Sequence, residues 1–263
     1  MSNTLSRLVV AAVLLPIALG VVYLGGWWLF ALVAVAALIA LHEFWLLARP
    51  LAPLALAGHL GAALALVGAQ LSGIGWMVGG LLATFVLAFC LKAVSESRQA
   101  ATIAVSATVT GVAWIAGGLA FLILLRALPV HGRLALFTLV LAVWAGDTLA
   151  YAGGRLFGRH KMAPRTSPGK TWEGFVCGTA ATVFVAFIAL YKQHFLSIPQ
   201  SIVLGVVIAV AAPLGDLFES LLKRDAGVKD SGRLLGGHGG MLDRLDAFFF
   251  AAPAAYFAVL AFS

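Results

Sequence analysis

Residues 8–42 read LVVAAVLLPIALGVVYLGGWWLFALVAVAALIALH and contain no Asp, Glu, Lys or Arg. A membrane-spanning helix needs about 20 apolar residues. This stretch therefore has room for two spans, and the Gly25-Gly26 pair is the expected break between them. Residues 50–91 are uncharged again and allow two more spans, with a break near Ser72-Gly73.

The composition agrees with a membrane protein. Of the 263 residues, 62% are hydrophobic and 10% are charged, and the mean hydropathy is +1.05. Soluble domains carry about 25% charged residues, so a soluble enzyme, a secreted scaffold and a disordered chain are all excluded. Cys90 and Cys177 lie among apolar residues and indicate neither a disulfide framework nor a zinc site. The run after Arg7 resembles a signal peptide, but the apolar sequence continues past it, which favours an uncleaved helix.

Further spans are predicted over residues 101–125, 134–153, 174–191, 200–222 and 246–262. The prediction is an all-α, polytopic membrane protein with about nine transmembrane helices. We expect one membrane domain over residues 1–263, with hydrophobic helices in 1–133 and catalytic helices and loops in 134–263. This count puts 14 of the 17 Lys and Arg residues on one side. The positive-inside rule then predicts a cell (inner) membrane protein whose N-terminus and loops 154–173 and 223–245 are cytoplasmic. The C-terminus is expected on the opposite side.

Acidic residues gather in the second half of the chain. All six Asp residues fall between Asp147 and Asp246, whereas the first half has only Glu43 and Glu96. Asp216 and Glu219 lie within or at the end of a predicted span, where a carboxylate needs a polar cavity, a metal or a partner. An ion pair between Glu219 and Lys223, four residues apart, is the structural alternative for Glu219.

Residues 223–246 alternate Lys, Arg, Asp and Gly. Basic side chains and glycine backbones bind phosphate oxygens, and carboxylates beside them indicate a Mg²⁺ ion between carboxylate and phosphate. A solvated loop of mixed charge is the alternative. Asp243 and Asp246 could equally cap the last helix, and His238 could donate to a phosphate or simply belong to a turn.

The loop between the sixth and seventh spans contains Gly169-Lys170-Thr171. A P-loop needs a glycine where this chain has Pro164, together with a preceding strand in an α/β sheet, so that interpretation is rejected. Ser167 and Lys170 remain a reasonable anion site at a helix N-terminus. Asp147, with Tyr151 one turn later, is expected to border the same cavity.

Three segments resemble the phosphatidate cytidylyltransferase (CDP-diacylglycerol synthase) family. The first is residues 220–246, which include SLLKR, KDSG and HGGMLDRLD; the second is SPGKTWEG at 167–174; the third is Asp147 to Gly154. The similarity covers roughly residues 140–250. It implies transfer of a cytidylyl group from CTP to phosphatidate, giving CDP-diacylglycerol and pyrophosphate with Mg²⁺ required. It leaves open a second, monovalent cation and a homodimer.

The resemblance also assigns roles to residues, at an active site expected at the cytoplasmic interface, where lipid tails enter from the bilayer. Asp216 and Asp243 match the metal ligands, with Asp246 and Glu219 in support. The basic signature residues are Lys223, Arg224, Lys229 and His238. Substrate contacts are expected from Ser167, Lys170, Thr171, Asp147 and Arg244. Membrane lipid is the other expected partner. Nucleic acid is not expected to bind.

Three other classes of protein fit the sequence less well. A transporter for an anionic substrate also needs intramembrane acids and basic loops, but transporters often have two related halves, whereas the acids here fill one half. A CDP-alcohol phosphotransferase resembles a D-G-x-x-A-R pattern that this sequence lacks. A purely structural scaffold would not need the acidic residues.

Overall fold

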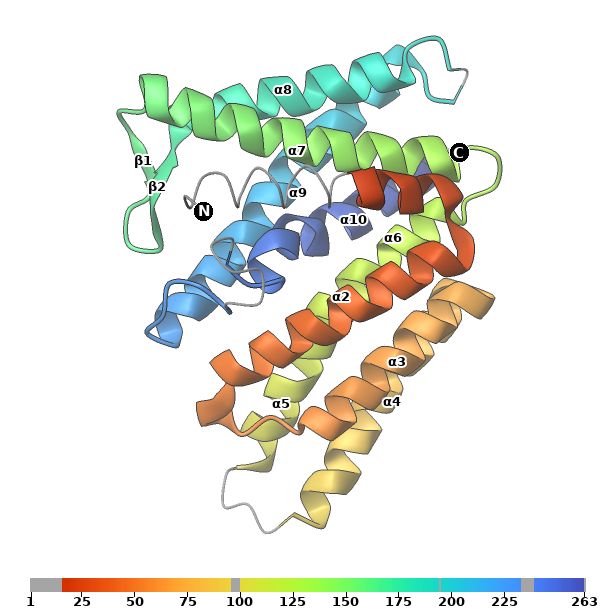
Figure 1. Cartoon of the computed structure of the whole chain (residues 1–263), viewed down its shortest axis with the longest axis vertical. Helices are drawn as coiled ribbons and strands as arrows, with labels where there is room; N and C mark the ends of the chain where they lie inside the picture. The colour runs from red at the N-terminus through yellow and green to blue at the C-terminus, as the bar shows by residue number, and fades with distance from the viewer. Residues whose placement is uncertain (1–15, 96–99, 194, 233–238, 263) are drawn as a thin grey trace. The chain divides into compact units, whose positions relative to one another are not determined.

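The computed structural model describes residues 16–95, 100–193, 195–232 and 239–262, and most of them are helical (Figure 1). Within this described part, eight helices are long and apolar enough to cross a membrane. They are Gly26–Leu47, Ala55–Ser72, Ile74–Ala93, Ala101–Arg126, Gly132–Phe157, Trp172–Leu190, Ile198–Asp225 and Leu242–Phe262. The chain is therefore a helical, multi-pass membrane protein, as predicted.

These eight helices correspond to the second to ninth predicted spans. The first predicted span falls largely on residues 1–15, which lie outside the described residues, while residues 16–24 are helical. A total of nine spans therefore stays a prediction. The predicted breaks are confirmed, because Gly25 and Gly73 separate consecutive helices with φ angles of 66° and 80°. Only glycine adopts such angles readily.

The chain forms two compact units. The first unit contains residues 1–124 and 226–245, and the second contains residues 125–225 and 246–263. The loop 223–245 was predicted to belong with the catalytic helices, whereas residues 226–245 fall in the first unit. A single membrane domain divided at residues 133/134 stays a prediction.

The first unit is a bundle of closely packed helices. It comprises α2 (Gly26–Leu47), the short η1 (Arg49–Leu51), α3 (Ala55–Ser72), α4 (Ile74–Ala93) and a continuous helix made of α5 (Ala101–Gly111), the π-helical η2 (Val112–Gly117) and most of α6 (Gly118–Arg126). Gly58 lies against the Trp45 indole, and Gly61 against Thr84. Small residues at these positions let membrane helices approach closely.

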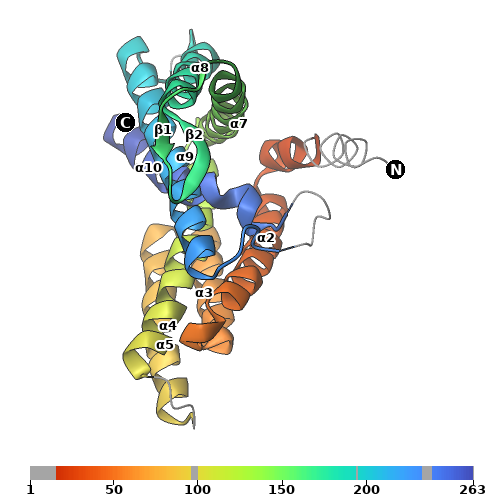
Figure 2. The same ribbon diagram turned by 90° about the vertical axis from the view of Figure 1, so that its left-hand side faces the viewer.

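The second unit carries most of the polar residues. It contains α7 (Gly132–Phe157), β1 (Lys161–Ala163), β2 (Ser167–Thr171), α8 (Trp172–Leu190), α9 (Ile198–Asp225) and α10 (Leu242–Phe262) from residue 246 onward. Helices α7 and α8 lie side by side, with the hairpin at one end (Figure 2). Gly153 faces Cys177 and Gly146 faces Thr182 across their interface, again through small residues.

The described boundaries differ from the predicted ones around the polar loops. Helix α7 continues to Phe157, and an antiparallel hairpin pairs Lys161 with Thr171 and Ala163 with Ser167 where only a loop was predicted. Helix α9 runs to Asp225, and α10 begins at Leu242. Lys223 and Arg224 are thus helical, and Asp243 lies in the first turn of α10.

Candidate active site

An ion pair in the second unit joins the β-hairpin to α9. Strand β2 places Lys170, whose Nζ lies 2.8 Å from Asp216 Oδ2 and 3.3 Å from the carbonyl oxygen of Pro213. The Lys170 side chain is 18% exposed and that of Asp216 is 42% exposed. An ammonium and a half-open carboxylate therefore lie together at a position that a ligand can reach. Both residues were predicted to belong to the site, but no contact between them was predicted.

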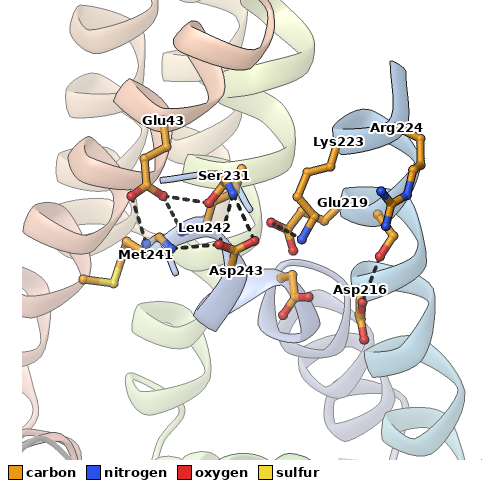
Figure 3. A network of polar contacts seen from close by, with 12 residues as sticks. Glu43, Asp216, Glu219, Lys223, Arg224, Ser231, Met241, Leu242 and Asp243 are labelled. Carbon is orange, nitrogen blue, oxygen red and sulfur yellow. Dashed lines mark hydrogen bonds and ion pairs between the residues drawn. The ribbon is translucent and has the colours of Figure 1, made fainter. Parts of the chain in front are cut away.

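One face of α9 carries the remaining polar residues of this group (Figure 3). Ser220 Oγ donates to Asp216 Oδ1 at 3.3 Å, and Lys223 Nζ lies 3.3 Å from Glu219 Oε1. The Glu219 side chain is fully buried. The structural alternative for Glu219, an ion pair with Lys223, is thus present. A supporting role for Glu219 at a metal stays a prediction.

Two further acids of the second unit add negative charge to this group. Asp147, on α7, interacts electrostatically with Asp216 and Lys170. Asp246, on α10, does so with Asp216, Glu219 and Asp147. Gly215 makes this approach of α9 and α10 feasible, because a Cβ atom there would collide with the backbone of Asp246. Several carboxylates with few cations form a site suited to a cationic partner.

The hairpin is held in place by side chains at both of its ends. Arg224 Nε donates to the carbonyl of Thr166 at 3.2 Å, which ties the hairpin turn to the end of α9. Glu173 Oε1 lies 2.6 Å from His160 Nδ1, and the Glu173 carboxylate accepts the N–H groups of Arg159 and His160. These contacts fix the strand that carries Lys170.

Some residues predicted to bind substrate have structural contacts. Thr171 is buried and caps α8, since its Oγ1 accepts the N–H of Gly174 at 3.1 Å. Ser167 is half-buried at the start of β2. In the first unit, Lys229 and Arg244 are exposed. His238 lies outside the described residues. The substrate and catalytic roles of all these residues stay predictions.

A second polar group, in the first unit, surrounds Glu43 of α2 (Figure 3). Its buried carboxylate accepts the N–H groups of Met241 and Leu242, at 3.0 and 2.8 Å, and the hydroxyl of Ser231 at 3.2 Å. Asp243 accepts the N–H groups of Ser231 and Gly240. Asp243 lies in the first turn of α10, but these two N–H groups precede the helix. Its capping role and its metal role both stay predictions.

Glu43 was not among the predicted site residues. One signal could have identified it, because it is the lone acid within residues 8–95 and it lies in an otherwise apolar span. An ionisable residue in a membrane span is by default a candidate for function. Its partners Ser231, Met241 and Leu242 could not be read from sequence spacing, since they lie 188 to 199 residues further along the chain.

The donor set fits Mg²⁺ held together with a substrate. Among the residues that the structure describes, no group of three His, Cys, Asp or Glu side chains could hold a metal by itself. Mg²⁺ is often bound through only one or two carboxylates plus substrate phosphates. Asp216 suits that mode, because its carboxylate is partly open and a phosphate-binding ammonium lies beside it. Asp243 belongs to the other unit, so metal binding by both acids stays a prediction.

Comparison with known proteins identifies related sequences. Residues 5–262 match the model of the cytidylyltransferase family. A phosphatidate cytidylyltransferase of Haemophilus influenzae is 43% identical over 130 residues, which are 48% of this chain and 45% of that protein. One from Mycobacterium tuberculosis is 46% identical over 132 residues, covering 49% and 39%. One from Staphylococcus aureus is 48% identical over 115 residues, covering 43% and 44%.

The two kinds of match differ in extent. Each curated relative is matched over less than half of its own length. The family match, in contrast, extends over nearly all 263 residues. The apolar helices and the clustered acids and bases described above occur within that range. The chain belongs to the cytidylyltransferase family.

Proposed function

We propose that this protein transfers a cytidylyl group from CTP to phosphatidate and releases CDP-diacylglycerol and pyrophosphate. The relatives named above carry this activity in their names. The observation that supports it in this chain is the Lys170–Asp216 pair, 2.8 Å apart and partly open. It offers a cation for phosphate oxygens beside a carboxylate for the metal ion that accompanies a nucleotide.

The proposed reaction is a direct displacement. An oxygen of the phosphatidate phosphate attacks the α-phosphorus of CTP and forms a new P–O bond. The bond from that phosphorus to the bridging oxygen breaks, and pyrophosphate leaves with the electron pair. Because the lipid phosphate is already anionic, no side chain has to activate it. Such transfers depend mainly on positioning and on neutralising charge.

Lys170 is the residue best placed to neutralise phosphate charge. Its ammonium has three donors. Two are directed at Asp216 and the Pro213 carbonyl, which leaves one for a phosphate oxygen. Lys223 and Arg224, in the last turn of α9, are further cations of the second unit. Arg224 also fixes the hairpin turn through Thr166, so it keeps Lys170 in position.

Mg²⁺ is the proposed cofactor, and Asp216 is the proposed principal ligand. When bound, Mg²⁺ would neutralise phosphate charge and orient the phosphates. Asp216 is held in place on both oxygens, by Lys170 on Oδ2 and by Ser220 on Oδ1. Asp243, Asp246 and Glu219 complete the proposed acidic set. A second, monovalent cation is left open.

We also propose an orientation. With nine spans, the N-terminus, the β-hairpin and the segment 223–245 face the cytoplasm, where CTP is available, and the C-terminus lies on the opposite side. The support is the one-sided distribution of Lys and Arg. A site at this surface receives the nucleotide from water and the lipid from the bilayer.

The test is Mg²⁺-dependent formation of CDP-diacylglycerol by purified protein, with Asp216→Asn and Asp225→Asn assayed in parallel. Asp225 is the exposed last residue of α9 and has no proposed role, so this variant controls for the change in charge. We expect the wild type and Asp225→Asn to be active and Asp216→Asn to be inactive. A wild type that stays inactive in several lipids and detergents would contradict the proposal, and binding assays would then test an anion transporter.

A further inference from the structure

In the segment 229–243, the backbone near Ser231 is tied to the backbone near Leu242 by two carboxylates, those of Glu43 and Asp243 (Figure 3). Glu43 accepts from the hydroxyl of Ser231 at one end and from the N–H groups of Met241 and Leu242 at the other. All of these residues belong to the first unit. Helix α2 thus contacts both ends of this segment through one side chain.

Asp243 connects the same two ends a second time. Its carboxylate accepts the N–H of Ser231 at 3.1 Å and the N–H of Gly240 at 2.8 Å. Bringing together the ends of a loop costs chain entropy. Hydrogen bonds to a carboxylate acceptor are among the stronger ones in proteins, so several of them can offset that cost. Glu43 and Asp243 together therefore hold the two ends of the segment together.

The surroundings of Glu43 are built for a carboxylate. Glu43 is only 4% exposed. A Cβ atom on Gly232 would lie 2.5 Å from Glu43 Oε1, and one on Gly240 would also collide with this carboxylate. Glycine at both positions is what lets the backbone reach Glu43 from either side. A buried carboxylate persists only with partners such as these.

We propose that Glu43 is a positioning residue for the reaction. This inference rests on the proposed function. Glu43 binds the two N–H groups that directly precede Asp243 at the start of α10, where a helix leaves its first N–H groups without internal acceptors. By fixing that first turn and the opposite end at Ser231, Glu43 determines where the backbone of the segment places Asp243.

The test compares Glu43→Gln with Thr84→Val. Glutamine keeps the size of the side chain but replaces one accepting oxygen with a donor group, which would face backbone N–H groups. Thr84 is also buried in the first unit, and its hydroxyl donates only to the Gly80 carbonyl among the hydrogen bonds that the structure shows. Thr84→Val therefore removes a buried hydroxyl at a position that does not contact the segment 229–243 in any hydrogen bond that the structure shows. Hydrogen exchange of residues 226–245 and steady-state kinetics are measured for each protein.

We expect exchange at residues 231–242 to be roughly tenfold faster in Glu43→Gln, as for loss of a hydrogen bond to a charged group. We expect kcat to fall by roughly 10–100-fold, since a displacement of about 1 Å costs on the order of 100-fold. Apparent KM for CTP should stay within about threefold, because binding by Lys170 and Asp216 is unaltered. Thr84→Val should match the wild type in all three measurements.

Ser231→Ala removes one of the three donors to Glu43 and should have smaller effects of the same kind. It provides the test if Glu43→Gln does not fold. Unchanged exchange in both variants, or faster exchange with wild-type kcat, would overturn the positioning role while an active wild type upholds the proposed function. An inactive wild type would overturn both proposals.

Discussion

Replacing Lys170 with alanine distinguishes a role in stability from a role in catalysis, because the two roles predict losses of very different size. The stability change follows from the geometry of the pair. Lys170 and Asp216 are 2.8 Å apart, but their side chains are 18% and 42% exposed, so solvent screens their attraction. Partly exposed pairs contribute about 0.2–1 kcal/mol to stability. Lys170→Ala should therefore fold, with a small loss of thermal stability.

The expected loss of activity is much larger. Removing one preorganised donor that stabilises developing charge costs about 2.7–4 kcal/mol, or roughly 100–1,000-fold in rate. A stability loss of about 1 kcal/mol cannot account for a 100-fold slower folded enzyme, since most molecules remain folded. We therefore expect kcat/KM for CTP to fall by roughly 100-fold or more.

The assay is incorporation of labelled CTP into lipid by purified Lys170→Ala, with thermal unfolding measured on the same samples. Arg165→Ala is the matched control, because it removes a positive charge from the exposed turn of the same hairpin. It should keep wild-type activity. If Lys170→Ala retains more than about one third of the wild-type rate, or Arg165→Ala loses as much, then Lys170 serves membrane topology and our reasoning about the site is wrong.

Three further predictions concern other parts of the chain. Asp243→Asn should lower turnover at least about 100-fold while the protein stays folded in detergent; a near-wild-type rate would remove Asp243 from the metal site. Lys223→Met should destabilise the protein by about 3–5 kcal/mol, because it removes the cation that lies 3.3 Å from the buried Glu219 side chain. Thermal unfolding should show recovery in Glu219→Gln/Lys223→Met, and no recovery would contradict this. A reporter fused after Ser263 should lie outside the cytoplasm; a cytoplasmic signal would mean that the number of spans is wrong by one.

The membrane spans could be predicted because their signals are local. Apolar stretches of the right length became helices, and glycines with positive φ at positions 25 and 73 separate consecutive ones. The Glu219–Lys223 pair was also accessible, because residues four apart share a helix face. Each of these features depends on residues that are neighbours in the chain.

The hairpin that presents Lys170 was not accessible in this way. Strand β2 has the sequence SPGKT, and Pro and Gly are disfavoured in strands. A two-stranded hairpin tolerates them because both strands are edges, and the Glu173 and Arg224 contacts supply order that strand propensity does not. The pairing of Lys170 with Asp216, 46 positions later, depends on that hairpin.

The long separation between Glu43 and its partners has a consequence for biogenesis. Leu242 follows Glu43 by 199 residues, which at about 5–20 residues per second corresponds to roughly 10–40 s of translation. During that interval the earliest helices are in the membrane while the backbone donors for Glu43 do not yet exist. The first-made bundle therefore completes its interior only after residues 231–242 have been synthesised. Chains that terminate before residue 231 leave the Glu43 side chain without these three donors.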